Sequence, residues 1–431
     1  MPEPPTLLPL DYSTSESRWY AQVTGYQWLV LVIACAGWIF DAFEGQLFNI
    51  TRQDMLRELL GSDLAQRKFW GDFFIAAFLA GGAVGGIAFG SLADRIGRKP
   101  VMAITILFYS LFSALTYFAG TLWHVAVLRF LVALGVGGEW AVAASLVAEI
   151  FPQRARARAG AVFHGSSVLG TMAAAFVGML VGVHWRYAFL ISALPALLLF
   201  AVQTGIREPE RWKEAQSEQR KLGSFSELFG DARWRRRAIF GLLLAAVGLG
   251  TFWSVVIAGQ DLTRELLLRN KWTLQQAAQQ SKLAYGVFET IGMGVGMVGF
   301  GPMAERLGRR GAFLLMHVCA FVIVPITCYL PHTYWQMLVL LSVFGFFTCG
   351  IHAGYAVYFP ELFPDHLRAT GSGICFNGGR ILAAPMMWLS GWVKSDIDLR
   401  LAIVLMGGLY LVGAFLLLFL PETKGKPLPE Q

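Results

Sequence analysis

The chain has 431 residues, of which 56% are hydrophobic, 15% are charged and 47 are glycine, and its mean hydropathy is +0.54. So few charged residues cannot cover a water-soluble body of this size, which excludes a soluble enzyme and indicates an integral membrane protein. The net charge of +7 does not indicate nucleic-acid binding, because membrane proteins gather Lys and Arg on their inner loops.

The apolar segments predict the helices. A bilayer core about 30 Å thick requires roughly 20 apolar residues per crossing helix, and twelve stretches of the sequence meet that requirement. In chain order, the predicted spans are 26–48, 70–92, 100–119, 122–148, 158–181, 187–206, 237–259, 282–303, 311–330, 333–359, 370–393 and 401–420. The polar stretch before the first span lacks the features of a cleaved signal peptide, so we expect the first span to be retained.

The basic residues predict the orientation of the chain. With the N-terminus in the cytoplasm, 22 Lys and Arg residues fall in inner segments, 11 in outer segments and two inside spans. This excess predicts cytoplasmic N- and C-termini. The predicted parts are a cytoplasmic N-terminal segment, a six-helix bundle, a cytoplasmic linker, a second six-helix bundle and a cytoplasmic tail, at residues 1–25, 26–206, 207–236, 237–420 and 421–431.

An internal repeat supports this division. Gly90–Lys99 recurs 211 residues later as Gly301–Arg310, and Glu149–Pro152 recurs 212 residues later as Glu361–Pro364. Two motifs with nearly the same offset indicate a duplicated six-helix unit. In such an arrangement one half can rock against the other around a central site.

The repeated motif and four others resemble those of a known family. Gly90–Lys99 resembles the loop motif of the major facilitator superfamily, and Pro421–Gly425 is similar to a motif of its sugar porters and their relatives. Gly137–Trp140, with Arg368–Gly371 and Phe376–Arg380, is most similar to bacterial proton symporters for lactate, sialate and related acids. The resemblance covers essentially the whole chain. It implies an all-α membrane protein of twelve transmembrane helices in two six-helix halves.

Charges near the inner ends of the spans are predicted to control gating. Asp94 can meet a helix N-terminus or a loop arginine such as Arg154 or Arg158, and Gly90 and Gly97 permit close packing and a tight turn. Such contacts must break when the carrier opens inward, although the same charges could serve topology alone. The predicted gating residues are Asp94, Arg95, Arg98, Glu149, Arg154, Arg158, Glu305, Arg306, Arg309, Glu361 and Arg368.

Ionisable residues inside the spans are the candidates for proton coupling, because a charge at membrane depth is costly unless it is paired or hydrated. Asp41 and Arg129 fall at similar depth, which predicts an ion pair that protonation of Asp41 would release; the alternative is a static pair. In sugar-porter relatives a matching acid and arginine have the coupling role. Glu44, Glu139 and Glu289 are further candidates, each with a structural or vestibular alternative.

Arg380 is the predicted anion-binding residue. It lies about 11 residues, or ~16 Å, into the span at 370–393, near the bilayer midplane, where a lone guanidinium can bind a carboxylate through two hydrogen bonds. The alternative is a salt bridge to Glu289, Asp41 or Glu44. Organic-anion transporters of the superfamily carry an arginine at a similar position. The other predicted substrate-binding residues are Asn377, Tyr355, Tyr358 and Trp38.

These features together predict a secondary active transporter that carries a small organic anion, such as a monocarboxylate, with a proton. The alternatives are a proton-coupled sugar or polyol porter and a non-transporting membrane nutrient sensor. An enzyme is not expected, and no cofactor or metal site is indicated. The predicted partners are the anion, the proton and the lipid bilayer, with no nucleic acid. The carrier is expected to act as a monomer in the cell inner membrane.

Overall fold

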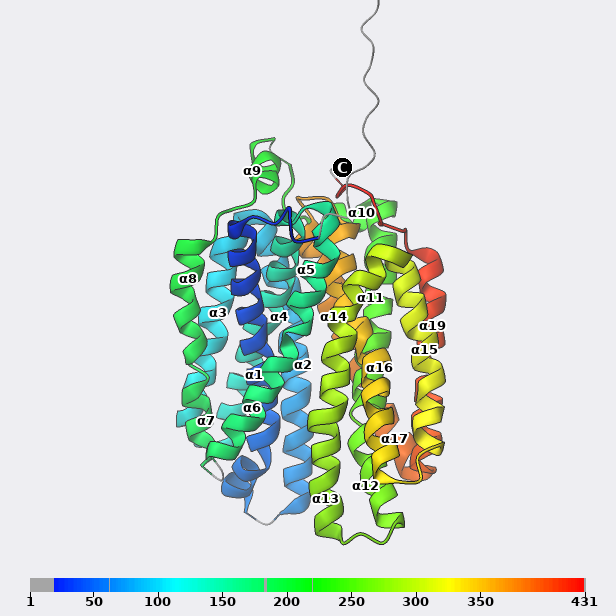
Figure 1. The fold of residues 1–431 in the computed structure, drawn as a ribbon. Helices are drawn as coiled ribbons and strands as arrows, with labels where there is room; N and C mark the ends of the chain where they lie inside the picture. The colour runs from blue at the N-terminus through cyan, green and yellow to red at the C-terminus, as the bar shows by residue number, and fades with distance from the viewer. Residues whose placement is uncertain (1–18, 62, 182–183, 219, 430–431) are drawn as a thin grey trace, which may run out of the picture.

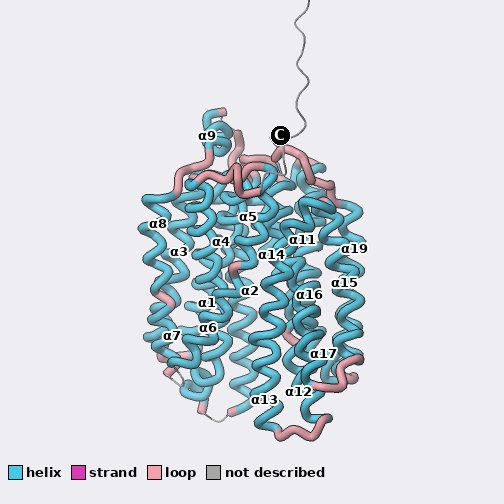
Figure 2. The backbone as a smooth tube through the Cα atoms, viewed as in Figure 1, coloured by secondary structure: helices cyan, strands magenta, loops and turns pink. Residues whose placement is uncertain are grey.

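A computed structural model describes residues 19–429 apart from 62, 182–183 and 219, and it describes the backbone alone for 64, 65, 68 and 387–396. Residues 1–18 of the predicted N-terminal segment and the last two residues of the predicted tail lie outside that part. The described regular structure is helical, without a β-strand. The helices run between two ends where the loops gather (Figure 2), because backbone groups inside a bilayer must be satisfied within a helix.

The first group of helices makes six crossings of the long dimension of the molecule. It consists of α1 (Gly25–Leu60), α2 (Leu64–Ile96), α3 (Arg98–Leu115) with η1 (Thr116–Phe118), α4 (Leu122–Ile150), α5 (Gln153–Gly165) with α6 (Ser167–Val181), and α7 (Trp185–Ile191) with η2 (Leu194–Leu197) and α8 (Leu198–Gly205). Two short helices follow, α9 (Glu210–Ser217) and α10 (Phe225–Gly230).

The second group repeats this order. It consists of α11 (Ala232–Thr251), η3 (Phe252–Val256) and α12 (Gly259–Arg269), then α13 (Leu274–Leu283), η4 (Ala284–Glu289) and α14 (Thr290–Leu307), then α15 (Arg309–Tyr329), α16 (Tyr334–Leu362), α17 (Arg368–Asp396), and α18 (Leu399–Gly407) with α19 (Leu409–Leu416) and η5 (Leu417–Phe419). The segments η3 and η4 are π-helical.

The two groups stand side by side, and α9 and α10 lie at one end together with the C-terminus (Figure 1). We call this end the linker end and the opposite end the far end. Within the described residues, eleven helical segments are long and apolar enough to cross a bilayer. The predicted span at 370–393 falls within α17.

Several helices are longer than the predicted spans. The helix predicted at 26–48 continues to Leu60, and the span predicted at 282–303 begins earlier, at Leu274. Hydropathy marks only the apolar part of a helix, whereas the helix itself continues until a cap ends it. Thr24 and Thr273 both form capping boxes at helix N-termini, each outside the predicted span.

Glycines bring the two halves together at the linker end. A Cβ at Gly90 on α2 would lie 2.7 Å from the Ala369 carbonyl oxygen of α17, and one at Gly301 on α14 would lie 2.8 Å from the Cα of Arg158 on α5. The predicted close approach at Gly90 is therefore confirmed. The repeated motif also ends α2 and α14 with glycines of positive φ, at +108° for residue 97 and +84° for residue 308, which confirms the predicted tight turn.

Candidate functional site

A cavity of about 220 Å³ lies between the two halves. Its walls are rich in aromatic side chains, namely Trp38, Phe48, Phe74, Phe78, Phe252, Trp253, Tyr285 and Phe376. Its ionisable lining residues are Asp41, Arg129, His164, His352 and Arg380, with Tyr285 and Cys349. The cavity therefore combines flat apolar walls with a few charged groups, a composition typical of sites for small organic ligands.

Arg380 reaches this cavity from α17, and no acidic residue in the described part pairs with it. Its Nη1 is buried and lacks a hydrogen-bond partner among the described residues, and a Cβ at Gly82 on α2 would lie only 2.0 Å from that nitrogen. The guanidinium carbon lies 5.7 Å from the ring centroid of Phe376. Within the described part, no salt bridge joins Arg380 to Glu289, Asp41 or Glu44, so the alternative pairing expected from the sequence is not formed.

Asp41 faces the same cavity from α1. Its side chain is buried, and neither carboxylate oxygen has a hydrogen-bond partner in the described structure. The charges of Asp41 and Arg380 act on each other without a direct ion pair. A second acid, Glu139, also acts on Asp41. The cavity lining thus holds a carboxyl group and a guanidinium group that form no ion pair with each other in the described structure.

Arg129 pairs with Glu44, which corrects the predicted pair with Asp41. Its Nη1 donates to both oxygens of Glu44, at 2.7 and 2.8 Å, and its guanidinium lies between the rings of Phe48 and Phe78, 4.1 and 4.0 Å from their centroids. Asp41 and Glu44 are one helical turn apart, about 4.5 Å along the axis, so a depth estimate cannot distinguish them. The longer side chain of Glu44 makes the contact.

The two remaining predicted coupling acids lie behind the cavity wall. Glu139 on α4 accepts a hydrogen bond from Thr105 at 2.8 Å through Oε2, while its Oε1 has no partner in the described part and fits against Gly37 of α1. Glu289 is fully buried, and both of its carboxylate oxygens lack a described partner. Neither acid lines the cavity.

Three of the predicted substrate-binding residues lie away from the cavity lining. Asn377 donates through Nδ2 to the carbonyl oxygen of Gly137 at 3.0 Å, which joins α17 to α4. Tyr355 donates to the carbonyl oxygen of Leu244 at 3.1 Å. Tyr358 donates to the carbonyl of Pro421 at the linker end. Their hydroxyl and amide groups find backbone partners, as buried polar groups usually do, which leaves Arg380 and Trp38 at the cavity.

The predicted residue Trp38 belongs to a cluster around His164 whose other members, Trp140 and Phe376, were not among the predicted site residues. Trp140 donates through Nε1 to His164 Nδ1 at 3.0 Å, and Trp38 donates to the His164 carbonyl oxygen, also at 3.0 Å. Because Nδ1 accepts, a neutral His164 carries its proton on Nε2. Trp140 stacks on Phe376 of the other half with ring centroids 3.9 Å apart. Its place in the Gly137–Trp140 motif was the signal that could have identified this cluster.

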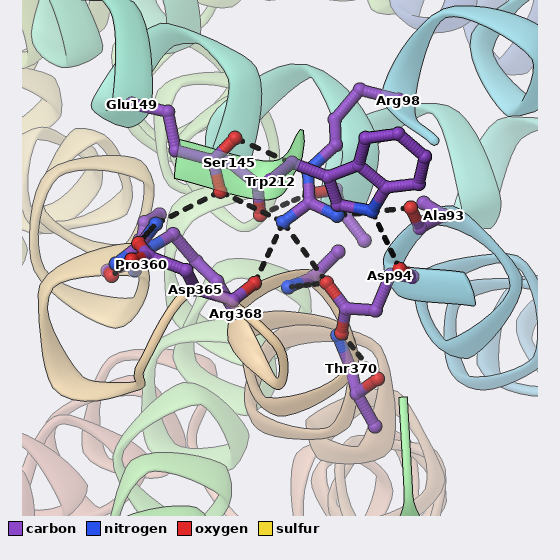
Figure 3. Close-up of polar contacts among 12 residues, drawn as sticks. Ala93, Asp94, Arg98, Ser145, Glu149, Trp212, Pro360, Asp365, Arg368 and Thr370 are labelled. Carbon is purple, nitrogen blue, oxygen red and sulfur yellow. Dashed lines mark hydrogen bonds and ion pairs between the residues drawn. The ribbon is translucent and has the colours of Figure 1, made fainter. Parts of the chain in front are cut away.

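Polar contacts between the halves concentrate at the linker end, where Figure 3 shows the largest group. Glu149 of α4 accepts from Arg98 at 2.7 Å and from Arg368 of α17 at 2.9 Å. Asp94 of α2 accepts from the backbone N–H groups of Ala369 and Thr370, at 3.1 and 2.8 Å. Asp94 therefore meets a helix N-terminus, one of the two partners expected for it.

A second contact between the halves joins Arg158 of α5 to Glu305 of α14 at 2.7 Å. Arg95 donates instead to the carbonyl oxygen of Gly223 in the segment before α10, at 3.3 Å. Arg154 and Arg306 are exposed and form no ion pair within the described residues, so neither joins these contacts. We call the contacts of Asp94, Glu149, Arg158, Glu305 and Arg368 between the halves the latch.

The linker is also attached to this region. Trp212 of α9 donates through Nε1 to the Asp94 carbonyl oxygen at 2.6 Å (Figure 3). His366, in the loop between α16 and α17, lies 2.7 Å from Glu227 of α10. Among the described residues, the direct polar contacts between the halves lie from the linker end to the depth of Asn377, so the cavity is closed toward the linker end.

Comparisons with known proteins agree with this architecture. The sequence profile described as Major Facilitator Superfamily matches residues 55–267 and 271–431. A solved structure of the proton:xylose symporter XylE, bound to 6-bromo-6-deoxy-D-glucose, superposes with a TM-score of 0.74 at 18% identity, covering 94% of this chain and 98% of that one. At 18% identity this similarity is evidence for a shared fold alone. The predicted all-α architecture of twelve helices in two halves is thereby confirmed.

Curated relatives of similar length are transport proteins. The chain is 27% identical to the "Probable 4-methylmuconolactone transporter" of Cupriavidus pinatubonensis, over 94% of this chain and 93% of the relative. It is 26% identical to the sialic acid transporter NanX of Escherichia coli, over 92% and 95%. It is 29% identical to the cis,cis-muconate transport protein of Acinetobacter baylyi, over 81% and 84%. The prediction of a membrane transporter rather than an enzyme is confirmed.

Proposed function

Because the chain belongs to the Major Facilitator Superfamily, we propose that this multi-pass membrane transporter is a proton-coupled symporter of a small organic anion. The observation that carries the proposal is Arg380, a guanidinium on the wall of the central cavity without an acidic partner in the described structure. An unpaired buried cation is costly, and a carboxylate ligand removes that cost through paired hydrogen bonds. The bound anion sits between the halves, where alternating access requires it.

Asp41 supplies the coupling to protons. Before an anion binds, the Asp41 carboxylate and the Arg380 guanidinium attract each other. An anion that binds Arg380 removes this attraction and adds a negative charge beside Asp41, so the carboxylate then takes up a proton more readily. Linkage is reciprocal, so a proton on Asp41 also strengthens anion binding.

The cavity walls favour flat, unsaturated carboxylates over polyhydroxylated solutes. Eight aromatic side chains line the cavity, and such faces bind planar π-systems well but offer few hydrogen bonds to hydroxyl groups. The names of two relatives refer to unsaturated solutes, cis,cis-muconate and 4-methylmuconolactone. We therefore place planar carboxylates first among candidate substrates and sugars behind them.

The latch and the linker then lie on the cytoplasmic side of the inner membrane, with both termini. This orientation follows the excess of basic residues on the linker side. The closed latch corresponds to a carrier whose cavity faces away from the cytoplasm, and the latch must open for release. One polypeptide contains the whole cavity, so we propose that the monomer is the working unit.

Uptake into proteoliposomes tests the proposal. The panel is nicotinate, cis,cis-muconate, lactate, sialate and glucose, each with and without an inward proton gradient. We expect gradient-driven accumulation of at least one planar carboxylate, and its loss when a protonophore dissipates the gradient. Accumulation of glucose alone would point to the sugar-porter alternative, and binding without uptake would point to a sensor.

A further inference from the structure

Glu289 is a buried acid with an unusual environment in the second half. It ends the π-helical segment η4, is fully buried, and has no hydrogen-bond partner for either carboxylate oxygen in the described part of the chain. A Cβ at Gly259 would lie 2.1 Å from its Oε2, and one at Gly345 would lie 3.2 Å from its Cγ. Glycines on α12 and α16 therefore enclose this side chain tightly.

Within the described part of the chain, no cation compensates a charge at this position. The titratable groups that interact with Glu289 are Tyr285 of η4, Cys349 of α16 and Tyr410 of α19, and all three types are ordinarily neutral near pH 7. No Arg, Lys or His acts on it among the described residues. A carboxylate enclosed in this way is much less stable than one in water, and a bound proton removes that cost.

The neighbours of Glu289 line the cavity. Tyr285, Thr290 and Cys349 all line the cavity, so Glu289 lies directly behind the wall that they form. Thr290 donates through Oγ1 to the Tyr285 carbonyl oxygen at 3.0 Å, across the wide turn of η4. Such π-helical turns are rare and are frequent at functional sites.

Asp41 and Glu289 have two properties in common, although only Asp41 lines the cavity. Each is at most 2% exposed, and both oxygens of each lack a described partner. They belong to different halves, and Glu289 is not among the groups that act on Asp41. The two carboxyls are therefore separate positions at which a proton can bind.

We propose that Glu289 is a second proton-binding site, so that one turnover carries two protons, on Asp41 and Glu289, with one monovalent anion. This inference rests on the proposed proton–anion symport. Two protons carry two positive charges and the anion carries one negative charge, so each turnover moves one net positive charge into the cell. Transport of a monovalent acid is then driven by the membrane potential as well as by the pH gradient.

Steady-state accumulation of nicotinate in proteoliposomes measures the net charge that is moved in each turnover. With one net charge per turnover, the accumulation ratio of the wild type should rise about tenfold per ~59 mV of inside-negative potential. With two protons it should rise about a hundredfold per pH unit at zero potential, since each proton contributes a factor of ten. A wild-type accumulation ratio that does not change with the membrane potential overturns the proposal.

Variants assign the second charge to Glu289. Glu289→Gln should lose the dependence on potential and keep about a tenfold rise per pH unit, whereas Glu289→Asp, which retains a carboxyl, should keep both slopes. Glu214→Gln, an exposed change on α9, is the matched control and should behave like the wild type. Retention of the wild-type slopes by Glu289→Gln excludes Glu289 as the second site.

Infrared titration tests the site without any transported solute. In purified protein in liposomes, the stretching band of protonated carboxyl groups should include a component that disappears as the pH rises and is missing in Glu289→Gln. An identical band in wild type and variant at every pH contradicts the proposal. If nicotinate is not transported at all, the proposed function fails for this acid, and the titration still decides whether Glu289 exchanges a proton.

Discussion

Arg129 and Arg380 both line the central cavity, and their partners separate their roles. Arg129 is held by Glu44 and by two aromatic rings, while the Nη1 of Arg380 at the cavity has no hydrogen-bond partner among the described residues. A buried charge with a good partner contributes to the structure. Removal of that charge leaves the partner buried without a counter-charge, which destabilises the protein. A buried charge without a partner remains available to a ligand.

Replacement of Arg380 by alanine should abolish anion binding. Loss of one member of a buried, hydrogen-bonded charge pair costs about 2–5 kcal/mol, which corresponds to roughly 30- to 4,000-fold weaker binding. Arg380→Lys keeps the charge but not the two-pronged geometry and should retain part of the affinity. Equilibrium binding of nicotinate and cis,cis-muconate measures this, and unchanged affinity in Arg380→Ala would remove Arg380 from the site.

Replacement of Glu44 by glutamine should destabilise the protein, whereas Asp41→Asn should not. The first change leaves Arg129 buried beside a neutral group and costs about 3–5 kcal/mol; the second removes no ion pair or hydrogen bond present in the described structure. Thermal unfolding in detergent compares the two variants. A larger loss of thermal stability in Asp41→Asn than in Glu44→Gln would restore the pairing expected from the sequence.

At the level of elements, the two halves begin equivalent helices in the same way. Glu208 accepts from the backbone N–H groups of Arg98 and Lys99 at the start of α3, both at 2.8 Å. Glu422 accepts from Arg309 and Arg310 at the start of α15, at 2.9 and 3.0 Å. A carboxylate at a helix N-terminus satisfies free N–H groups and opposes the positive end of the helix dipole.

The pH dependence of stability should report the Glu422 cap. Burial acts to raise the pKa of this carboxyl, but the N–H donors of residues 309, 310, 423 and 424 outweigh burial and hold that pKa below its usual range. Its stabilisation is therefore complete above the unfolded pKa of about 4.3 and is lost as the pH falls through the lower folded value.

Thermal unfolding of Glu422→Gln measures the contribution of the Glu422 carboxylate to the stability of the protein. At pH 7 the variant should be less stable by about 0.3–1 kcal/mol, the usual range for a charge at a helix terminus. The difference from the wild type should shrink as the pH falls below about 4. A difference that stays constant across this range would show that the charge of Glu422 does not contribute.

At the scale of the whole molecule, the latch contacts of one half are nearly equivalent to those of the other half under the internal repeat. Asp94 contacts Thr370 of the other half, and Glu305, 211 positions after Asp94, contacts Arg158, 212 positions before Thr370. The symmetry breaks at Glu149, which binds an arginine from each half, whereas Glu361 binds Arg309 of its own half and Thr423. Glu149 therefore pairs with both halves at once, which its repeat counterpart Glu361 does not.

Removal of the Glu149 charge should open the linker end. In Glu149→Gln the buried Arg98 and Arg368 lose their shared partner, so conformations that let water reach them gain stability. Spin labels at Gln153→Cys on α5 and Leu307→Cys on α14, with the native cysteines replaced, report the separation of the halves. We expect a longer label distance in Glu149→Gln. Glu361→Gln, which breaks a pair within one half, is the control and should leave the distance unchanged.

The sequence by itself determined the membrane location, the number and order of the spans, the duplication and the family. These properties depend on apolar length and on local motifs, which are read along the chain. The positive φ at Gly97 and the close packing at Gly90 belong to the same group, because only glycine permits them. Arg380 could also be placed near the midplane, since its position in a long helix fixes its depth.

Only the tertiary structure decided which charged groups meet. Residues one turn apart, such as Asp41 and Glu44, have nearly the same depth, and the rotation and spacing of the neighbouring helices select the one that reaches Arg129. The same geometry turns Asn377, Tyr355 and Tyr358 to backbone carbonyls and leaves Glu289 enclosed without a described partner. Side-chain pairing depends on distances between helices that lie far apart in the sequence, and no local pattern encodes those distances.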